Sequence, residues 1–218
     1  LGFDDEGVAA ALRGPEGARE VRVERVISAV GIEANVEDLG LEGTGVRLDR
    51  GHVVVDPWLE TGEPGVYAIG DLTAPPWLAH KASHEATICV EKIAGLAHVS
   101  PLDVNRIPAC TYSHPQVASL GLTEHQARAR GLEVRTGTFP FAANGKAIAM
   151  RQEDGMVKTV FDATTGELLG AHMIGSDVTE LIQGYATAMS AEATDTELAN
   201  TVFPHTQLSE GEHQSVLH

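Results

Sequence analysis

The stretch Gly65-Val66-Tyr67-Ala68-Ile69-Gly70-Asp71 decides how the rest of the chain is interpreted. The residues from Val66 to Ile69 have the β-branched, aromatic and small apolar character of a short buried strand. Gly70 allows a close backbone approach at the end of that strand. Asp71 then places a carboxylate beyond the carboxyl edge of a sheet, where open α/β folds bind ligands. By themselves these residues favour an ordinary strand followed by a Gly-Asp turn.

A helix is predicted shortly after this stretch. Gly95 stands where a glycine commonly ends a helix. The amino terminus of such a helix carries a partial positive charge, which favours an anionic group beside the acidic turn. The apolar or small residues that repeat on one face of the expected helix are Ala82, Ala86, Cys89, Val90 and Ile93.

The segment from Thr61 to Asp71, followed by Leu78-Ala79-His80-Lys81-Ala82, resembles the second flavin-contact motif of the pyridine nucleotide–disulfide oxidoreductases. Its Ala-His-Lys-Ala form is more similar to the dihydrolipoyl dehydrogenase branch of that family than to the glutathione reductase branch. The resemblance implies that the carboxylate of Asp71 accepts a hydrogen bond from the ribityl chain of FAD. It also implies an isoalloxazine site lined by Trp77, Leu78, Ala79 and His80, with Trp77 standing where the family often has Met.

The acidic composition excludes some classes of partner. A formal net charge of −16 over 218 residues argues against nucleic acid and against an anionic membrane surface. No apolar run approaches the ~20 residues of a transmembrane helix. Cys89 and Cys110 are expected to be buried thiols in a reducing compartment, although the sequence leaves a disulfide between them open. No metal site is predicted. The resemblance implies a cytoplasmic protein in bacteria, or a mitochondrial matrix protein in eukaryotes.

The chain begins at Leu1 and contains neither Gly-x-Gly-x-x-Gly nor Cys-x-x-x-x-Cys. A flavoprotein of this family needs a phosphate-binding glycine motif and a redox-active cysteine pair. We therefore expect the chain to be the C-terminal half of a longer protein, and to be inactive by itself.

Three segments are expected, which together give an α/β fragment followed by an α+β dimerisation domain. Residues 1–34 resemble the end of the NAD-binding domain, with a strand from Val21 to Val30. The resemblance places Gly31 near the nicotinamide cofactor NAD, although Ile32 stands where the family usually has Arg. Residues 35–105 resemble the second segment of the FAD-binding domain, with a short strand at Val53–Val55. Residues 106–218 resemble the interface domain.

The interface segment carries its own strand and capping patterns. A capping box is predicted at Thr123, in a helix that Gly131 is predicted to stop, and two further helices are predicted to be capped at Asp177 and Thr194. The expected strands are Ala109–Tyr112, Glu133–Phe139, Met156–Phe161 and Leu168–Met173.

The C-terminal segment carries the candidate chemistry. A capping box of Ser209 and Glu212 predicts a helix that starts near Glu210, so His205 lies in the preceding loop. Across such a corner a carboxylate can fix the tautomer of a histidine and leave its other nitrogen as a base. Taken alone, the two residues favour an ordinary loop histidine and a glutamate that stabilises a helix start, because ordinary helix starts have this pattern.

The same pair matches the disulfide oxidoreductases, whose C-terminal motif is a histidine followed five residues later by a glutamate. The resemblance implies that His205 is the acid–base catalyst and that Glu210 orients it. The family usually has proline after the histidine, often with a cis peptide. Because Thr206 stands there and a cis bond without proline costs ~3 kcal/mol, we expect a peptide that is either trans or strained.

The resemblance as a whole implies oxidation of protein-bound dihydrolipoamide, with electrons passing through FAD to NAD. It also implies a homodimer, in which each histidine serves the other subunit, and a lipoyl-bearing E2 component of a 2-oxo acid dehydrogenase complex as partner. A glutathione- or mercuric-reductase-like enzyme stays open, although the tail lacks the terminal cysteine pair of mercuric reductases. A non-catalytic dimerisation module is the remaining alternative.

Overall fold

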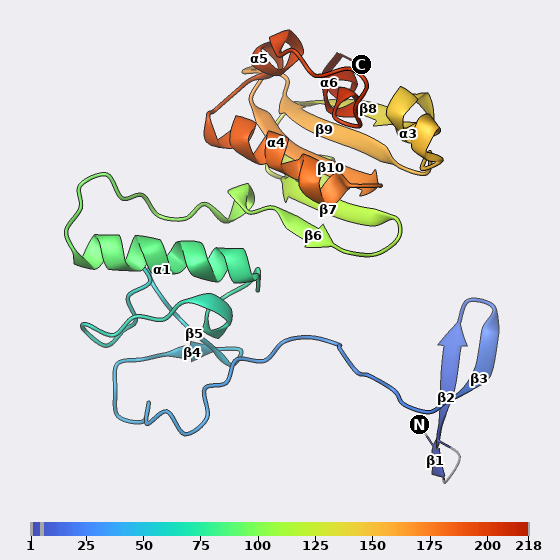
Figure 1. Ribbon diagram of the computed structural model, residues 1–218. Coiled ribbons are helices and arrows are strands. Elements are labelled where there is room, and N and C mark those ends of the chain that lie inside the picture. The colour runs from blue at the N-terminus through green and yellow to red at the C-terminus, as the bar shows by residue number, and fades with distance from the viewer. Residues whose placement is uncertain (1, 5–6, 218) are drawn as a thin grey trace.

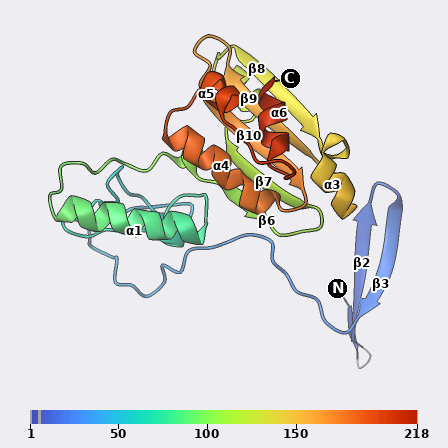
Figure 2. The same ribbon diagram turned by 45° about the horizontal axis from the view of Figure 1, so that its top comes forward.

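The computed structural model describes residues 2–4 and 7–217 (Figure 1). The N-terminal strands β1 (Gly2–Asp4), β2 (Gly7–Gly14) and β3 (Gly17–Val23) form an antiparallel sheet in the order β1-β2-β3. Figures 1 and 2 show this sheet standing apart from the rest of the chain. An irregular segment from residue 24 to residue 47 joins it to the next part.

The predicted strand from Val21 to Val30 is wrong beyond Val23, where β3 ends. Ile27 and Val30 are 91% and 93% exposed, and no described strand lies beside residues 24–30 to pair with them. An apolar segment needs a neighbouring strand to satisfy its backbone groups before it can form a sheet.

The middle of the chain is built around helix α1 (Ala79–Ile93), with β4 (Leu48–Asp49) and β5 (His52–Val53) as a small antiparallel pair. The predicted helix and its glycine stop are confirmed, because Gly95 has φ of +74° and its N–H donates to the carbonyl of Lys92. The expected apolar face is only partly right. Val90 and Ile93 are 65% and 58% exposed. The buried face carries Lys81, Glu85, Ile88 and Cys89.

The strand expected at Val66–Ile69 is not formed. Tyr67 makes only an isolated bridge to Glu60, and Val66 is exposed. The segment runs instead into a short 3₁₀ turn, Gly70–Leu72, which packs against α1. The described chain offers these residues no second strand, so their strand propensity is not realised.

The C-terminal part is an antiparallel sheet in the order β6-β7-β10-β9-β8. The five strands include four predicted ones, whose ends differ from the prediction by at most two residues, and one strand that was not predicted, Gln116–Gly121. The strands are β6 (Ala109–Thr111), β7 (Gln116–Gly121), β8 (Val134–Pro140), β9 (Met156–Asp162) and β10 (Leu168–Gly175).

Helices α4 (Val178–Ser190) and α6 (Glu210–Leu217) cover one face of this sheet, as Figures 1 and 2 show. They share one apolar core with the strands, which includes Phe141, Phe161, Tyr185 and Val216. α2 (Glu124–Ala129) covers a smaller cluster around Val160. The remaining helices are α3 (Gly145–Met150) and α5 (Asp195–Asn200).

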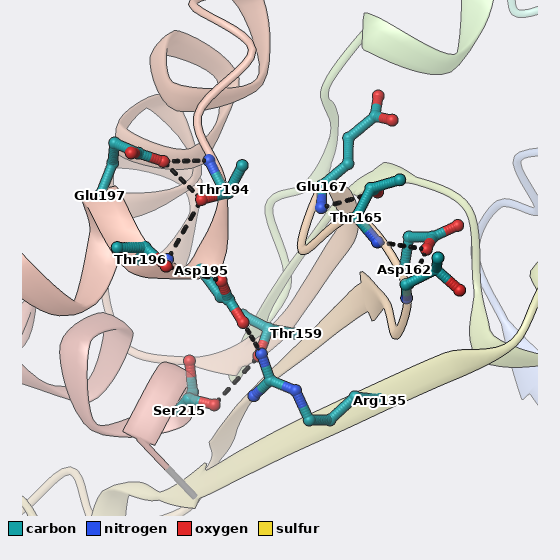
Figure 3. A network of polar contacts seen from close by, with 11 residues as sticks. Arg135, Thr159, Asp162, Thr165, Glu167, Thr194, Asp195, Thr196, Glu197 and Ser215 are labelled. Carbon is teal, nitrogen blue, oxygen red and sulfur yellow. Dashed lines mark hydrogen bonds and ion pairs between the residues drawn. The ribbon is translucent and has the colours of Figure 1, made fainter.

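A polar network attaches the last helices to the sheet (Figure 3). Arg135 on β8 pairs with Asp195 on α5, and the hydroxyl of Thr159 on β9 donates to the carbonyl of Ser215 on α6 at 3.0 Å. Gly137 makes the approach of α6 possible, because a Cβ at this position would collide with the Ser215 carbonyl oxygen. The two helices on either side of the segment that carries the candidate chemistry, α5 and α6, are therefore both attached to the sheet.

Two of the four predicted helix caps are formed, both as capping boxes, and two are not. Thr123 with Gln126, and Thr194 with Glu197, make both reciprocal hydrogen bonds. Asp177 makes no side-chain cap, because its φ of 57° is left-handed instead of extended. The start of α4 is capped instead by Gln116 on β7, whose Oε1 accepts from the N–H of Thr179 at 3.3 Å and from its hydroxyl at 2.9 Å.

The box predicted between Ser209 and Glu212 is also wrong. The side chain of Glu212 is turned into the core beside Gly184, and its Oε1 has no hydrogen-bond partner among the described residues. The helix itself begins at Glu210, as the sequence predicts.

Candidate functional site

Asp71 lies in the middle of the 3₁₀ turn Gly70–Leu72 and is exposed. The turn depends on Gly70, whose φ of +69° is left-handed and disfavours other residues. A Cβ at this position would also lie 3.2 Å from the Cβ of Ala82 on α1. The sequence therefore places a free carboxylate on a tight turn held against the first turns of a helix.

Two buried side chains of α1 make hydrogen bonds to this turn and to the residue that follows it. Glu85 Oε2 accepts from the N–H of Gly70 at 2.7 Å, and Glu85 Oε1 pairs with Lys81 Nζ at 2.7 Å. Lys81 Nζ also donates to the hydroxyl of Thr73 at 3.0 Å, and that hydroxyl donates to the Gly70 carbonyl at 2.8 Å. The sequence does not predict this set, because a lysine and a glutamate four residues apart on a helix are typical of a solvated face.

The amino terminus of α1 is open to a ligand. Its N-cap residue, Leu78, has no oxygen in its side chain and makes no side-chain cap. The first N–H groups of a helix are left without an intrahelical acceptor, and they favour an anion. Trp77 stands just before the helix, where its Nε1 donates to the Thr73 carbonyl at 3.0 Å and its ring stacks on His52 at 4.8 Å.

His80 is oriented differently from its neighbours. Its Nε2 lies 2.8 Å from the carbonyl oxygen of Pro108, so the ring joins α1 to the segment that leads into β6. Its side chain lines a cleft of about 590 Å³ between α1, residues 100–108 and α4.

His205 and Glu210 are brought together at the start of α6. His205 Nδ1 lies 2.8 Å from Glu210 Oε1, while the histidine side chain is 79% exposed. The carboxylate is an acceptor, so Nδ1 donates and Nε2 carries the free lone pair. The imidazole is therefore oriented on one side and accessible on the other.

Glu210 also holds the loop beside the histidine. Its Oε2 accepts from the N–H of Gln207 at 3.0 Å. The hydrogen bond from His205, followed by that from the Gln207 backbone, holds the pKa of the Glu210 carboxyl below its usual value. The peptide bond between His205 and Thr206 is cis, so the expected trans bond is wrong. The carboxylate of Glu210 contacts residues on both sides of that bond.

Asn144 supports the same loop and was not predicted as a site residue. It is 2% exposed, and its Oδ1 caps α3 by accepting from the N–H groups of Lys146 and Ala147 at 3.0 Å. Its Nδ2 donates to the carbonyls of Gln207 and Leu208 at 3.2 and 3.4 Å. The only signal in the sequence is an asparagine before a short helix, which indicates a cap but not the second role.

The predicted site residues fall into separate parts of the chain. Asp71 and the residues from Trp77 to His80 surround the amino end of α1, whereas His205 and Glu210 lie on the C-terminal part (Figure 1). Gly31 lies in the irregular segment, with φ of +116°.

Both cysteines are free thiols, so the disulfide left open by the sequence is not formed. Cys89 is buried, whereas Cys110 is only half-buried, and burial raises the pKa of each thiol. Within residues 2–4 and 7–217, no group of three or more His, Cys, Asp or Glu side chains is arranged to hold a metal ion. In the same residues no helix combines the length and the apolar character needed to cross a membrane.

Two family descriptions match the chain. Residues 107–216 match the dimerisation domain of the pyridine nucleotide-disulphide oxidoreductases, and residues 3–86 match the pyridine nucleotide-disulphide oxidoreductase domain. Together they cover most of the sequence, including the turn of Asp71 and the pair of His205 and Glu210.

Similar curated proteins are dihydrolipoyl dehydrogenases of bacteria. The protein of Rhizobium etli is 56% identical over 199 residues, which cover 91% of this chain and 41% of that protein. The protein of Zymomonas mobilis is 54% identical over 215 residues, which cover 98% of this chain and 46% of that protein. The chain thus spans less than half the length of these relatives.

Solved structures agree on the fold. LpdA from Mycobacterium tuberculosis superposes with a TM-score of 0.88 at 28% identity, over 99% of this chain and 46% of that chain. The HOCl-induced flavoprotein disulfide reductase RclA from Escherichia coli superposes with a TM-score of 0.84, over 99% of this chain and 48% of that chain. At 24% identity RclA supports the fold alone.

These comparisons confirm the expected fold class, an α/β fragment followed by an α+β dimerisation domain. By its sequence and by its fold, the chain belongs to the pyridine nucleotide–disulphide oxidoreductase family.

Proposed function

We propose that this chain is part of a dihydrolipoyl dehydrogenase, which oxidises protein-bound dihydrolipoamide to lipoamide and passes the electrons to NAD. The observation that carries the proposal is the His205–Glu210 pair, with a hydrogen bond of 2.8 Å on one ring nitrogen and the side chain 79% exposed. The names of relatives at 56% and 54% identity support the choice of substrate class within the family.

His205 would act as the base toward a dihydrolipoyl thiol. The proton moves from sulfur to Nε2, since Nδ1 is occupied by its hydrogen bond to Glu210. Glu210 is stabilised in its ionised form by His205 and by the N–H of Gln207, so it remains an acceptor as the ring becomes positive. A nearby carboxylate stabilises the imidazolium, and the thiolate is left as the reactive species.

The residues around α1 fit a flavin. Asp71 offers an acceptor-only carboxylate suited to a ribityl hydroxyl, and the helix start beyond Leu78 offers N–H donors without a side-chain cap. FAD, when bound there, would supply the two-electron redox chemistry that no side chain of this chain provides. Trp77 and Ala79 would line its isoalloxazine, together with Leu78 and His80, and Gly31 would lie near NAD.

The whole protein would act as a homodimer, with His205 of each subunit serving the flavin site of the other. Its partner would be the lipoyl-bearing E2 component of a 2-oxo acid dehydrogenase complex. The bacterial relatives support a cytoplasmic setting in a bacterium.

The proposal is tested with the purified whole protein that contains this chain. NADH formation from NAD and dihydrolipoamide is followed by absorbance, with reduced glutathione as the competing thiol substrate. We expect turnover with dihydrolipoamide only. Turnover with glutathione and none with dihydrolipoamide would move the protein to another branch of the family.

A further inference from the structure

The two groups proposed to contact the flavin, the Asp71 carboxylate and the open amino terminus of α1, are not adjacent in the chain. They are joined by the buried hydrogen-bonded set of Gly70, Thr73, Lys81 and Glu85, called here the turn clamp. Thr73, Lys81 and Glu85 are 2%, 3% and 4% exposed. Side chains of this polarity are almost never buried to this degree unless they are paired.

The turn clamp forms a closed ring. From the N–H of Gly70 it passes through Glu85 Oε2, then Glu85 Oε1 to Lys81 Nζ at 2.7 Å, and then to the hydroxyl of Thr73 at 3.0 Å. The ring closes where the hydroxyl and the N–H of Thr73 donate to the Gly70 carbonyl at 2.8 and 3.0 Å.

This arrangement fixes both ends of the turn that carries Asp71. Glu85 holds the N–H at its first residue, and Lys81 holds the side chain of Thr73 just after it. Lys81 and Glu85 both belong to α1, so the turn has one position relative to the start of that helix. Groups held in their binding geometry before a ligand arrives lose less entropy when it binds.

A gain in stability does not by itself explain why Lys81 and Glu85 form a buried charged pair. Replacing a buried ion pair by apolar side chains of similar volume is often neutral or stabilising. A buried pair that fixes the register of one segment against another is better supported as a role.

We infer that Lys81 and Glu85 are positioning residues, which hold the Asp71 turn at a fixed place relative to the amino terminus of α1 so that both bind one flavin. The inference rests on the proposed function, because it assumes that Asp71 contacts FAD. The pair itself does not touch the cofactor in this assignment.

The test is a double-mutant cycle in the flavin-loaded whole protein. Glu85→Gln keeps an acceptor for the N–H of Gly70 but removes the charge that pairs with Lys81. FAD release is followed by the rise of flavin fluorescence, well below the unfolding temperature, in Glu85→Gln, Asp71→Ala and the double variant. We expect Glu85→Gln to speed release roughly tenfold when Asp71 is present, and by no more than about threefold when Asp71 is alanine.

Thr73→Val is a second variant for the case in which Glu85→Gln does not fold. It keeps the ion pair and the bond from the Gly70 N–H to Glu85, and removes the bonds that the Thr73 hydroxyl makes with Lys81 and with the Gly70 carbonyl, so a smaller effect with the same dependence on Asp71 is expected. Glu124→Gln is the matched control. It removes the charge of Glu124, which pairs on the C-terminal part with Arg128 four residues away at 3.0 Å and with Lys158 at 2.7 Å, and it should leave FAD release unchanged.

The outcomes separate the inference from the proposed function. If Asp71→Ala releases FAD at the original rate, the flavin role of Asp71 fails and the inference fails with it. If Asp71→Ala weakens FAD binding but Glu85→Gln and Thr73→Val have no effect, or the same effect in both backgrounds, only the positioning role is overturned. If the Glu124→Gln control released FAD as fast as Glu85→Gln, the positioning role would also be overturned.

Discussion

The hydroxyl of Tyr185 on α4 donates a hydrogen bond to the backbone carbonyl of Glu212 on α6 at 3.0 Å. The hydroxyl of Ser215 lies 2.9 Å from the same phenol oxygen and donates to the same carbonyl at 2.8 Å. Tyr185 is 1% exposed, and this burial raises the pKa of its phenol. Helix α6, which begins with Glu210, is thus held against the core of the C-terminal part. The exposed His205 is therefore hydrogen-bonded to a carboxylate whose helix has a fixed position.

The first prediction concerns the buried carboxyl of Glu212. Burial raises its pKa from 4.5 to about 8 in the folded protein. Between these values the folded state keeps a proton that the unfolded chain releases, so the free energy of unfolding should fall as pH rises through this window. The slope is at most ~1.4 kcal/mol per pH unit. Glu212→Gln cannot ionise and should remove this part of the slope.

Urea unfolding at pH about 5 and about 8 measures the effect in both proteins. Glu197 lies on α5 and is exposed, and its capping hydrogen bonds lower the pKa of its carboxyl, so Glu197→Gln should not reduce the loss of stability at high pH. Parallel pH curves for the original protein and Glu212→Gln would contradict the buried, protonated state.

The second prediction concerns the base. His205→Gln in the whole protein should lower turnover by roughly 10²–10⁴, the range for loss of general acid–base catalysis. Folding should be preserved, because the side chain is 79% exposed and adds little to the core. Steady-state NADH formation measures the first effect and thermal unfolding the second. His125→Gln, at an exposed histidine on α2, is the control. Near-normal turnover would remove His205 from the mechanism.

The third prediction concerns the acidic turn. Asp71→Ala should weaken FAD binding by ~1–3 kcal/mol, because a bound hydroxyl would lose its acceptor. Flavin content after extensive dialysis of the whole protein measures this loss. Asp49→Ala, at an exposed carboxylate on β4, should retain its flavin. Full occupancy in Asp71→Ala would show that the carboxylate is not a ligand.

The fourth prediction concerns Asn144, which caps α3 and supports the loop after His205. Asn144→Ala should lower the free energy of unfolding by about 1–3 kcal/mol, because it removes a helix cap and two hydrogen bonds from Nδ2 to backbone carbonyls of the loop. Turnover should also fall, since the loop that presents the histidine loses its support. Asn200→Ala removes an exposed amide on α5 and is the matched control. A loss of stability with unchanged turnover would restrict Asn144 to the cap.

Local signals predicted those features that depend on a few neighbouring residues. The capping boxes of Thr123 and Thr194 were predictable because both partners lie in the first turn of the helix. The helix start at Glu210 and the contact of Glu210 with His205 are of the same kind. The catalytic role of that pair stays a prediction, as do the flavin contacts and the domain boundaries.

The wrong predictions concern features that depend on segments far away in the sequence. Gln116 supplies the acceptor that Asp177 was expected to supply, and the core beside Gly184 takes the carboxylate of Glu212. The strands predicted beyond Val23 and at Val66–Ile69 needed neighbouring strands that the described chain does not offer. Lys81 and Glu85 looked like a surface pair because nothing local reveals that the Gly70 turn covers them.

The burial of Lys81 and Glu85 constrains how this sequence can diverge. Replacing either residue alone leaves its partner as an uncompensated charge away from water, which is strongly destabilising, whereas exchanging both for apolar residues avoids that penalty. An evolutionary path between the two solutions must pass through a poorly stable intermediate or change both codons together. Among related sequences the two positions should therefore change together, and a charged residue at one position with an apolar residue at the other should be rare.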